Sequence, residues 1–195
     1  IAMFRAQIHQ KLGADAVNDM QAFTKWVPRP GAMTRPIVRS AMQESLRRMN
    51  TEMLDMLQFH WWDYSHPAYL DAMQHLADLQ QAGQIRHLGL TNFDTEHTQK
   101  IVEAGIPIVS NQVQYSLIDR RPEVAMVPFC QANEMSLLTY GTLCGGLLSE
   151  QYLEKPEPTP RELRTASLRK YKQMIDLWGG WRSEERRVGE ECRSR

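Results

Sequence analysis

The sequence predicts an α/β protein, an incomplete (β/α)8 TIM barrel in which about five of the eight strands are present. Short apolar segments alternate with amphipathic helices, which implies a parallel sheet with helices outside it. Polar residues stand at the C-terminal ends of successive strands, where a barrel keeps its active site. No G-x-G-x-x-G follows a strand, which argues against a doubly wound dinucleotide-binding domain. A full barrel needs roughly 250 residues, so we expect only part of one, over residues 1–181.

The chain begins inside a predicted helix. Ile1, Phe4, Ile8 and Leu12 follow helical spacing, and Gly13 acts as a stop. A first residue other than Met, in a helix without a cap, favours a fragment of a longer protein.

The remaining helices are predicted from apolar residues at helical spacing, with a cap before them or a glycine after them. Thr34 is expected to cap the helix that follows it, and Gly83 to end the next one. The expected strands are 22–27, 56–60, 85–90, 108–113 and 136–140. The expected helices after the first are 36–50, 66–83, 95–104, 124–133 and 162–178, the last following a proline-rich linker.

Composition narrows the functional class. Lys plus Arg and Asp plus Glu both number 23, and the pI near 7.2 argues against nucleic acid or an anionic membrane as main partner. No apolar run approaches the roughly 18 residues of a membrane-spanning helix, and no secretory leader opens the chain. Cys130, Cys144 and Cys192 are odd in number and widely spaced, which fits a reducing compartment. We therefore expect a cytoplasmic protein, and its oligomeric state stays open.

The last fourteen residues, 182–195, differ from the rest of the chain. They carry nine charges and one large apolar residue, Val188, so they cannot bury a core. The run closely resembles the translation of a common sequencing adapter, from which it differs at Glu190. We expect this tail to be non-native and disordered, and exclude it from the fold.

Lysine and histidine stand at the ends of the first two strands. Lys25 is a candidate active-site amine whose pKa burial would lower, although a surface lysine would also fit this position. His60 is followed by Trp61 and Trp62, so we expect a substrate pocket walled by aromatic rings around a proton donor. A core histidine is the alternative. A metal site with His66 is disfavoured because the spacing matches no known ligand pattern, and we expect no metal.

Amide and hydroxyl side chains end the next two strands, at Thr91, Asn92 and Gln112. Together they could hold a planar carboxamide, which offers one acceptor and two donors. Each of them taken alone could simply close a strand.

A glycine-rich loop follows the last predicted strand. Tyr140 ends that strand, where its ring could stack on a flat ligand. Gly141, Gly145 and Gly146 follow in the loop, and glycines let backbone N–H groups approach phosphate closely.

Together these segments resemble the aldo-keto reductase family, NAD(P)H-dependent carbonyl reductases on a (β/α)8 barrel. The segment from Ala82 to Phe93 resembles a family signature that usually ends in Gly-x-Ser-Asn-Phe or -Tyr, with Thr91 in place of the serine. The segment Tyr-Gly-Thr-Leu-Cys-Gly-Gly-Leu-Leu from Tyr140 resembles the family's Tyr-Ser-Pro-Leu-x-x-Gly-Leu-Leu loop. Lys25 and His60 stand where the family places two catalytic residues.

The resemblance implies a role for each matching residue. Lys25 and His60 would be catalytic, and Thr91, Asn92 and Gln112 would bind the nicotinamide carboxamide. Tyr140 would stack on the nicotinamide ring. The pyrophosphate path would be lined by Gly141, Leu143, Gly145 and Gly146. The implied cofactor is NADP(H) ahead of NAD, although the residues themselves leave that choice open, and the implied substrate is a small carbonyl compound.

Half of the family's catalytic residues have no match here. Its catalytic aspartate and tyrosine would precede the first predicted strand, and no Asp-x4-Tyr precedes Lys25. The fragment alone is therefore expected to be inactive. Two other functions stay open: a non-catalytic cofactor-binding subunit like the potassium-channel β-subunits, and a Schiff-base aldolase with Lys25 as nucleophile.

Overall fold

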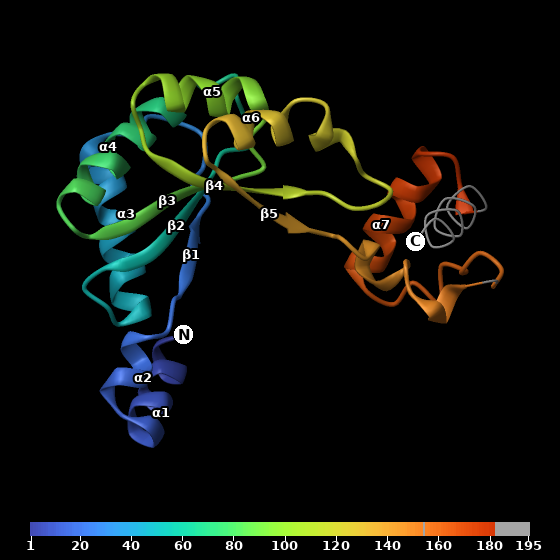
Figure 1. The fold of residues 1–195 in the computed structure, drawn as a ribbon, viewed down its shortest axis with the longest axis horizontal. Helices are drawn as coiled ribbons and strands as arrows, with labels where there is room; N and C mark the ends of the chain where they lie inside the picture. The colour runs from blue at the N-terminus through green and yellow to red at the C-terminus, as the bar shows by residue number, and fades with distance from the viewer. Residues whose placement is uncertain (154, 182–195) are drawn as a thin grey trace. The chain divides into compact units, whose positions relative to one another are not determined.

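The computed structural model describes residues 1–153 and 155–181, so the predicted tail over 182–195 lies outside the described residues. It contains one five-stranded sheet (Figure 1). The strands are β1 (Phe23–Trp26), β2 (Leu54–His60), β3 (Ile85–Thr91), β4 (Ile108–Gln114) and β5 (Ser136–Tyr140). The helices are α1 (Ala2–Leu12), α2 (Ala14–Asn18), α3 (Arg35–Met49), α4 (Tyr69–Gln81), α5 (Thr95–Glu103), α6 (Met126–Ala132) and α7 (Ala166–Leu177). Short 3-10 turns cover Arg121–Glu123, Cys144–Gly146 and Glu150–Tyr152.

The strand order settles the choice between the two candidate architectures. The strands lie in chain order, β1-β2-β3-β4-β5, and the pairs β1–β2, β2–β3 and β3–β4 are parallel. Right-handed crossovers between parallel strands in sequential order place every connecting helix on the same side of the sheet. A doubly wound sheet would instead reverse its strand order at a switch point. The predicted fold is confirmed as a partial (β/α)8 barrel.

The register divides the side chains of the sheet into two faces. One face, here called the inner face, carries side chains from alternate positions of β1 to β4. It comprises Phe23, Lys25, Met56, Gln58, His60, His87, Gly89, Thr91, Ser110 and Gln112. The opposite face packs under the helices, and Leu57, Phe59, Leu88 and Leu90 on it are fully buried.

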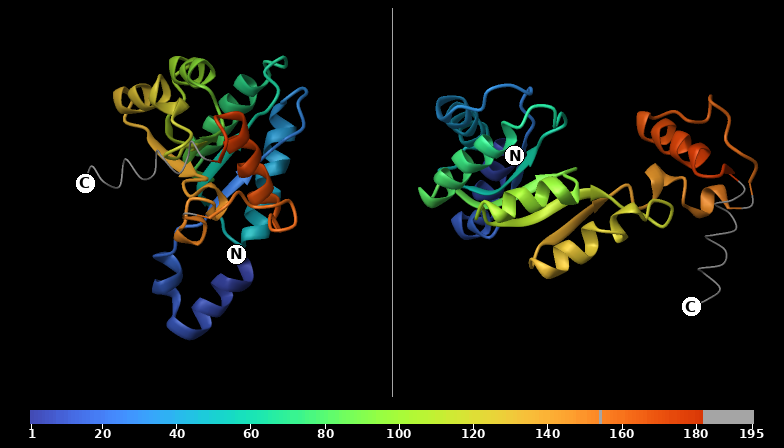
Figure 2. Two further views of the ribbon diagram at one scale, coloured as in Figure 1. Left: turned by 90° about the vertical axis from the view of Figure 1, so that its right-hand side faces the viewer. Right: turned by 90° about the horizontal axis from the view of Figure 1, so that it is seen from above.

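The helices complete that core. In Figure 1, α3, α4, α5 and α6 flank the strands to which they are joined. They contribute buried side chains that include Val38, Met42, Met73, Leu76, Ile101 and Cys130. By contrast, α1 buries none of its residues, and in Figure 2 α1 and α2 project beyond the start of β1. No helix among the described residues is long and apolar enough to cross a membrane.

The contacts of the chain divide into two compact units. The first unit comprises Ile1–Gln112 and Met126–Leu138. The second comprises Val113–Ala125 and the described residues from Thr139 onward. The second unit has its own core of Ile118, Cys144, Leu147, Leu163, Tyr171, Ile175 and Trp181.

Some element boundaries differ from the predicted ones for identifiable reasons. Thr34 precedes α3 with extended dihedrals, but its side chain makes no capping bond. Pro36 occupies the second helical position and has no N–H to offer. The last helix begins at residue 166 rather than 162, because the Thr165 hydroxyl accepts from the Leu168 N–H and caps it there. Glu162 instead accepts from Thr159 in the preceding turn.

Phe59 offers a test of the helix-facing core. Its ring is fully buried and lies 5.5 Å from Trp26 and 6.0 Å from Phe93, between ring centroids. We expect Phe59→Ala to lower the free energy of unfolding by about 3–5 kcal/mol, as truncation of a buried aromatic does. Phe4→Ala on α1, where the ring is 55% exposed, should change it by less than about 0.5 kcal/mol. Urea denaturation of both variants measures the difference, and equal losses would contradict the assignment of Phe59 to the core.

Candidate functional site

The structure brings four of the predicted site residues onto the inner face. His60 pairs with Thr91, and Thr91 pairs with Gln112, so these three stand side by side on neighbouring strands. Lys25 lies on the same face one pleat away, beside Gln58. Since all four are at or near the carboxyl ends of parallel strands, they occupy the edge where barrels bind ligands.

A hydrogen bond connects the two ends of this group. The Lys25 Nζ donates to the Gln112 Oε1 at 2.5 Å. Strands β1 and β4 are three strand spacings apart, about 14 Å in a flat sheet. Two side chains meet across that distance when the sheet curls toward its inner face, as the wall of a barrel does. The curvature therefore makes the inner face concave around the site.

Burial and charge alter the titration of the two candidate catalytic residues. Burial lowers the pKa of the Lys25 ammonium. Burial lowers the pKa of His60 as well, and the positive charge of Lys25 lowers it further. The neutral imidazole is therefore favoured, with one ring N–H available as a donor. In the unfolded chain His60 has its ordinary pKa near 6.5, so on acidification it is protonated there before it is protonated in the folded protein. The folded protein therefore loses stability as the pH falls from about 6.5 toward the lowered pKa of His60.

The end of β3 presents a hydroxyl and an amide. Thr91 is buried, and its Oγ1 has no hydrogen-bond partner among the described residues. Asn92 follows with an exposed side chain and a left-handed φ of 56°. Its backbone N–H donates to the Gln112 carbonyl oxygen at 2.8 Å, which ties the ends of β3 and β4 together. A buried hydroxyl with unused hydrogen-bonding capacity fits a ligand site.

The two predicted pocket tryptophans lie in different environments. Trp61 is 1% exposed in the core, where its Nε1 donates to the carbonyl oxygens of Asp63 and His66. Trp62 is 59% exposed. Of these two rings, that of Trp62 is the one accessible from solvent. No group of three or more His, Cys, Asp or Glu side chains that could hold a metal ion was found among the described residues.

Gln58 is an inner-face residue that sequence reasoning missed. It is 6% exposed, next to Lys25 in the register, and its Nε2 has no hydrogen-bond partner within the described parts of the chain. The signal was present in the sequence, since an amide interrupts an otherwise apolar strand in Met56–His60.

The glycine-rich loop belongs to the second unit. The ammonium of Lys170 lies 5.3 Å from the centroid of the Tyr140 ring, in cation–π geometry. Gly141 has a φ of 73°, and a Cβ there would collide with the Tyr171 hydroxyl, so only glycine fits. Among the remaining loop residues, Leu143 is exposed, and Gly145 and Gly146 also have positive φ.

A pocket of about 880 Å³ opens beside this loop, within the second unit. Gly145 and Gly146 line it together with Lys155 and Arg164, two basic residues that sequence reasoning also missed. A signal for them was available, because they flank the prolines that follow the glycine-rich loop. Glycine backbone beside basic side chains can bind phosphate. Glu157 and Glu162 also line the pocket and offset part of its positive charge.

Comparison with known proteins agrees with the partial-barrel fold. The model of the Aldo/keto reductase family matches residues 3–188. The chain is 32% identical over 114 residues to aldo-keto reductase YhdN of Bacillus subtilis, covering 58% of this chain and 34% of that protein. It is 32% identical over 148 residues to protein tas of Escherichia coli, covering 65% of this chain and 43% of that protein.

A solved structure is similar over a comparable span. The crystal structure of an aldo/keto reductase from Klebsiella pneumoniae in complex with NADP and acetate matches with a TM-score of 0.62 and 26% identity. The match covers 77% of this chain and 51% of that one. The chain thus spans about a third to a half of the length of these relatives.

The coupling between Lys25 and His60 can be measured directly. In Lys25→Met we expect the pKa of His60 to rise toward its ordinary value near 6.5 without reaching it, because the charge is lost while burial remains. Titration of the His60 ring protons by NMR measures the shift. Lys100→Met removes an ammonium that pairs with Glu96 on α5 and should leave His60 unchanged. An unchanged His60 pKa in Lys25→Met would show that the two groups do not interact.

Proposed function

The chain belongs to the aldo/keto reductase family, and from that membership we propose that it carries part of the active site of an NADP(H)-dependent carbonyl reductase. When bound, the cofactor would supply a hydride to the carbonyl carbon of an aldehyde or ketone. The complex of the Klebsiella relative with NADP supports the choice of NADP(H) over NAD.

The observation that carries the proposal is the convergence of Lys25, His60, Thr91 and Gln112 on the inner face, closed by the Lys25–Gln112 hydrogen bond. The exposed Asn92 side chain follows at the same strand edge. A nicotinamide carboxamide needs two acceptors for its N–H groups and a donor for its oxygen. Side-chain amides and a hydroxyl provide both kinds of group, so Thr91, Asn92 and Gln112 would bind it.

Lys25 and His60 would act on the carbonyl compound. The lowered pKa of His60 keeps its imidazole neutral near pH 7, so one ring N–H can donate to the carbonyl oxygen and orient it. The Lys25 ammonium would stabilise negative charge that develops on that oxygen or on a neighbouring proton donor. Its hydrogen bond to Gln112 would hold the ammonium at the inner face for this role. Trp62 would contribute an exposed apolar wall for the substrate.

In the second unit, the glycine-rich loop would bind phosphate. Gly141, Leu143, Gly145 and Gly146 would line the path of the pyrophosphate, and Lys155 and Arg164 would supply positive charge in the adjoining pocket. Tyr140 would stack on the nicotinamide ring.

We also propose that the 195 residues by themselves do not catalyse carbonyl reduction. The family's proton-donating tyrosine and its aspartate have no counterpart before Lys25 in this sequence. Loss of a general acid costs about 10²–10⁴-fold in rate. A barrel completed with the strands that carry these two residues should reduce aldehydes with NADPH, and failure to do so would favour a non-catalytic, cofactor-binding subunit.

Lys25 can be tested in that completed barrel. We expect Lys25→Met to lose most of the NADPH-dependent reduction of a reactive aldehyde, followed by absorbance, while NADPH still binds. Lys11→Met, an exposed position on α1, should keep the parent rate. A parent-like rate in Lys25→Met would reject the catalytic assignment. Borohydride trapping of the substrate on Lys25 would instead establish Schiff-base chemistry.

The proposed stacking of Tyr140 on the nicotinamide ring can be tested by measuring NADPH affinity in the completed barrel. Tyr140→Ala should weaken NADPH binding by about 1 kcal/mol, roughly fivefold in the dissociation constant, because an aromatic stack is lost. Tyr140→Phe keeps the ring and should bind like the parent. Fluorescence titration measures both constants, and equal affinities in the two variants would exclude stacking.

A further inference from the structure

Asn111 on β4 is fully buried on the helix-facing side of the sheet, yet it makes directed polar contacts. Its Nδ2 donates to the Phe93 carbonyl oxygen at 2.9 Å and lies 3.6 Å from the Met126 sulfur. Its Oδ1 is buried without a hydrogen-bond partner among the described residues. A buried amide that is only half satisfied costs folding free energy, so packing alone does not account for an asparagine at this position.

The next residue on β4 holds the same turn from the other side. The Gln112 carbonyl oxygen accepts from the Asn92 backbone N–H at 2.8 Å. Gln112 therefore holds the peptide group that precedes Asn92, and Asn111 holds the peptide group that follows Phe93. Between these two hydrogen bonds, Asn92 adopts a left-handed φ of 56°, which is uncommon for any residue except glycine.

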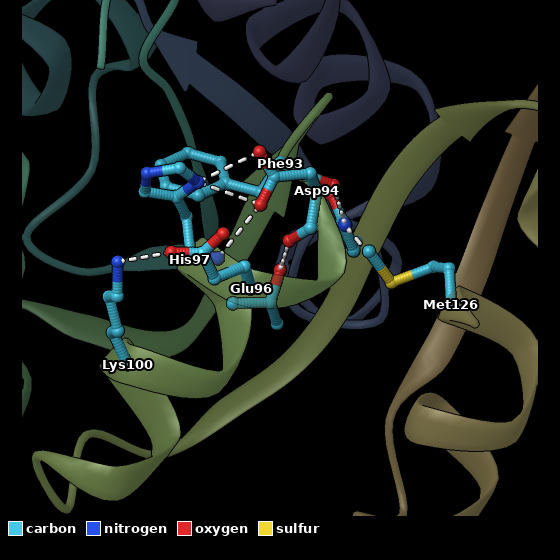
Figure 3. A network of polar contacts seen from close by, with 8 residues as sticks. Phe93, Asp94, Glu96, His97, Lys100 and Met126 are labelled. Atoms are coloured by element: carbon cyan, nitrogen blue, oxygen red, sulfur yellow. Dashed lines mark hydrogen bonds and ion pairs between the residues drawn. The ribbon is translucent and has the colours of Figure 1, made fainter. Parts of the chain in front are cut away.

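The chain that follows is fixed to α5. Asp94 accepts from the His97 backbone N–H at 2.8 Å and from the His97 Nδ1 at 2.7 Å. The Thr98 hydroxyl donates to the Asp94 carbonyl oxygen at 2.6 Å. Figure 3 shows Phe93, Asp94, His97 and Met126 within this one network. The chain therefore leaves Asn92 along a path set by hydrogen bonds to two different elements.

We propose that Asn111 is a positioning residue that keeps Asn92 in its left-handed conformation and so sets the spacing between the Asn92 and Gln112 side-chain amides. The effect of this spacing on ligand binding rests on the proposed function, in which the Asn92 and Gln112 side-chain amides bind a carboxamide. Alternation of side chains along the strand explains why Gln112 and Asn111 have different roles. Gln112 points to the inner face, whereas Asn111 points away from it and acts only through Phe93.

Energetics support a specific effect of Asn111. The left-handed conformation costs an asparagine little when hydrogen bonds hold it, but without the anchor at Phe93 the turn can relax toward ordinary dihedrals. A displacement of about 1 Å in a positioning group can cost about 10²-fold in rate. Deleting the Asn111 amide should therefore disturb the binding edge more than the fold.

The first test compares two buried positions on one strand by amide-resolved hydrogen exchange of this chain. In Asn111→Ala we expect the Asn92 N–H to exchange about tenfold faster, while the amides of Leu88 and Leu90 in β3 keep their rates. Ser110→Ala is the matched control. Ser110 is 1% exposed, and its hydroxyl contacts the Met56 sulfur rather than the turn. Unchanged exchange at Asn92, or equal acceleration at Asn92, Leu88 and Leu90, would overturn the proposal.

The second test asks whether the turn matters for the ligand. In the completed barrel, Asn111→Ala should raise the NADPH dissociation constant about tenfold, and Ser110→Ala should leave it within about twofold. Faster exchange at Asn92 with unchanged NADPH affinity would overturn the link to ligand binding. Absence of NADPH binding by the unsubstituted barrel would instead reject the proposed function, and the exchange experiment would still decide the role of Asn111.

Discussion

The alternation of side chains along parallel strands in register is the constraint on which both the fold and the candidate site depend. Leu57 and Phe59 of β2 and Leu88 and Leu90 of β3 alternate along their strands and are fully buried under the helices. The intervening residues, among them His60 and Thr91, face the other way. A slip of one residue in any strand pair would exchange the two faces. The core that stabilises the sheet thus also fixes which side chains meet at its inner face.

Much of the fold could be predicted from local sequence. Strand β5 spans the predicted residues 136–140, and α5 begins at the predicted Thr95. Apolar periodicity and glycine stops are local signals, so they survive without knowledge of the rest of the chain. Missed features depended on side-chain hydrogen bonds, as in the later start of α7, or on a short element, α2, too brief to show a period.

The candidate site was predictable in part for a similar reason. Strand ends carrying Lys25, His60, Thr91 and Gln112 can be recognised in sequence, and parallel pairing then brings them to one edge. The burial of Trp61 could not be inferred, because a tryptophan next to a strand end can turn to either side. Asn111 was equally hidden, since its contact with Phe93 joins residues 18 positions apart in the chain.

The unpaired polar atoms of the sheet bear on how this protein would respond to selection for heat resistance. Thr91 Oγ1, Gln58 Nε2 and Asn111 Oδ1 are buried without partners in the described chain, and an unmet hydrogen bond of this kind costs about 1–3 kcal/mol. Apolar replacements of similar shape at Thr91 and Gln58 would remove this cost and at the same time erase polar groups on the inner face. Stability and ligand recognition therefore compete at the same few positions, and a variant library screened for thermostability alone would enrich proteins that have lost the site.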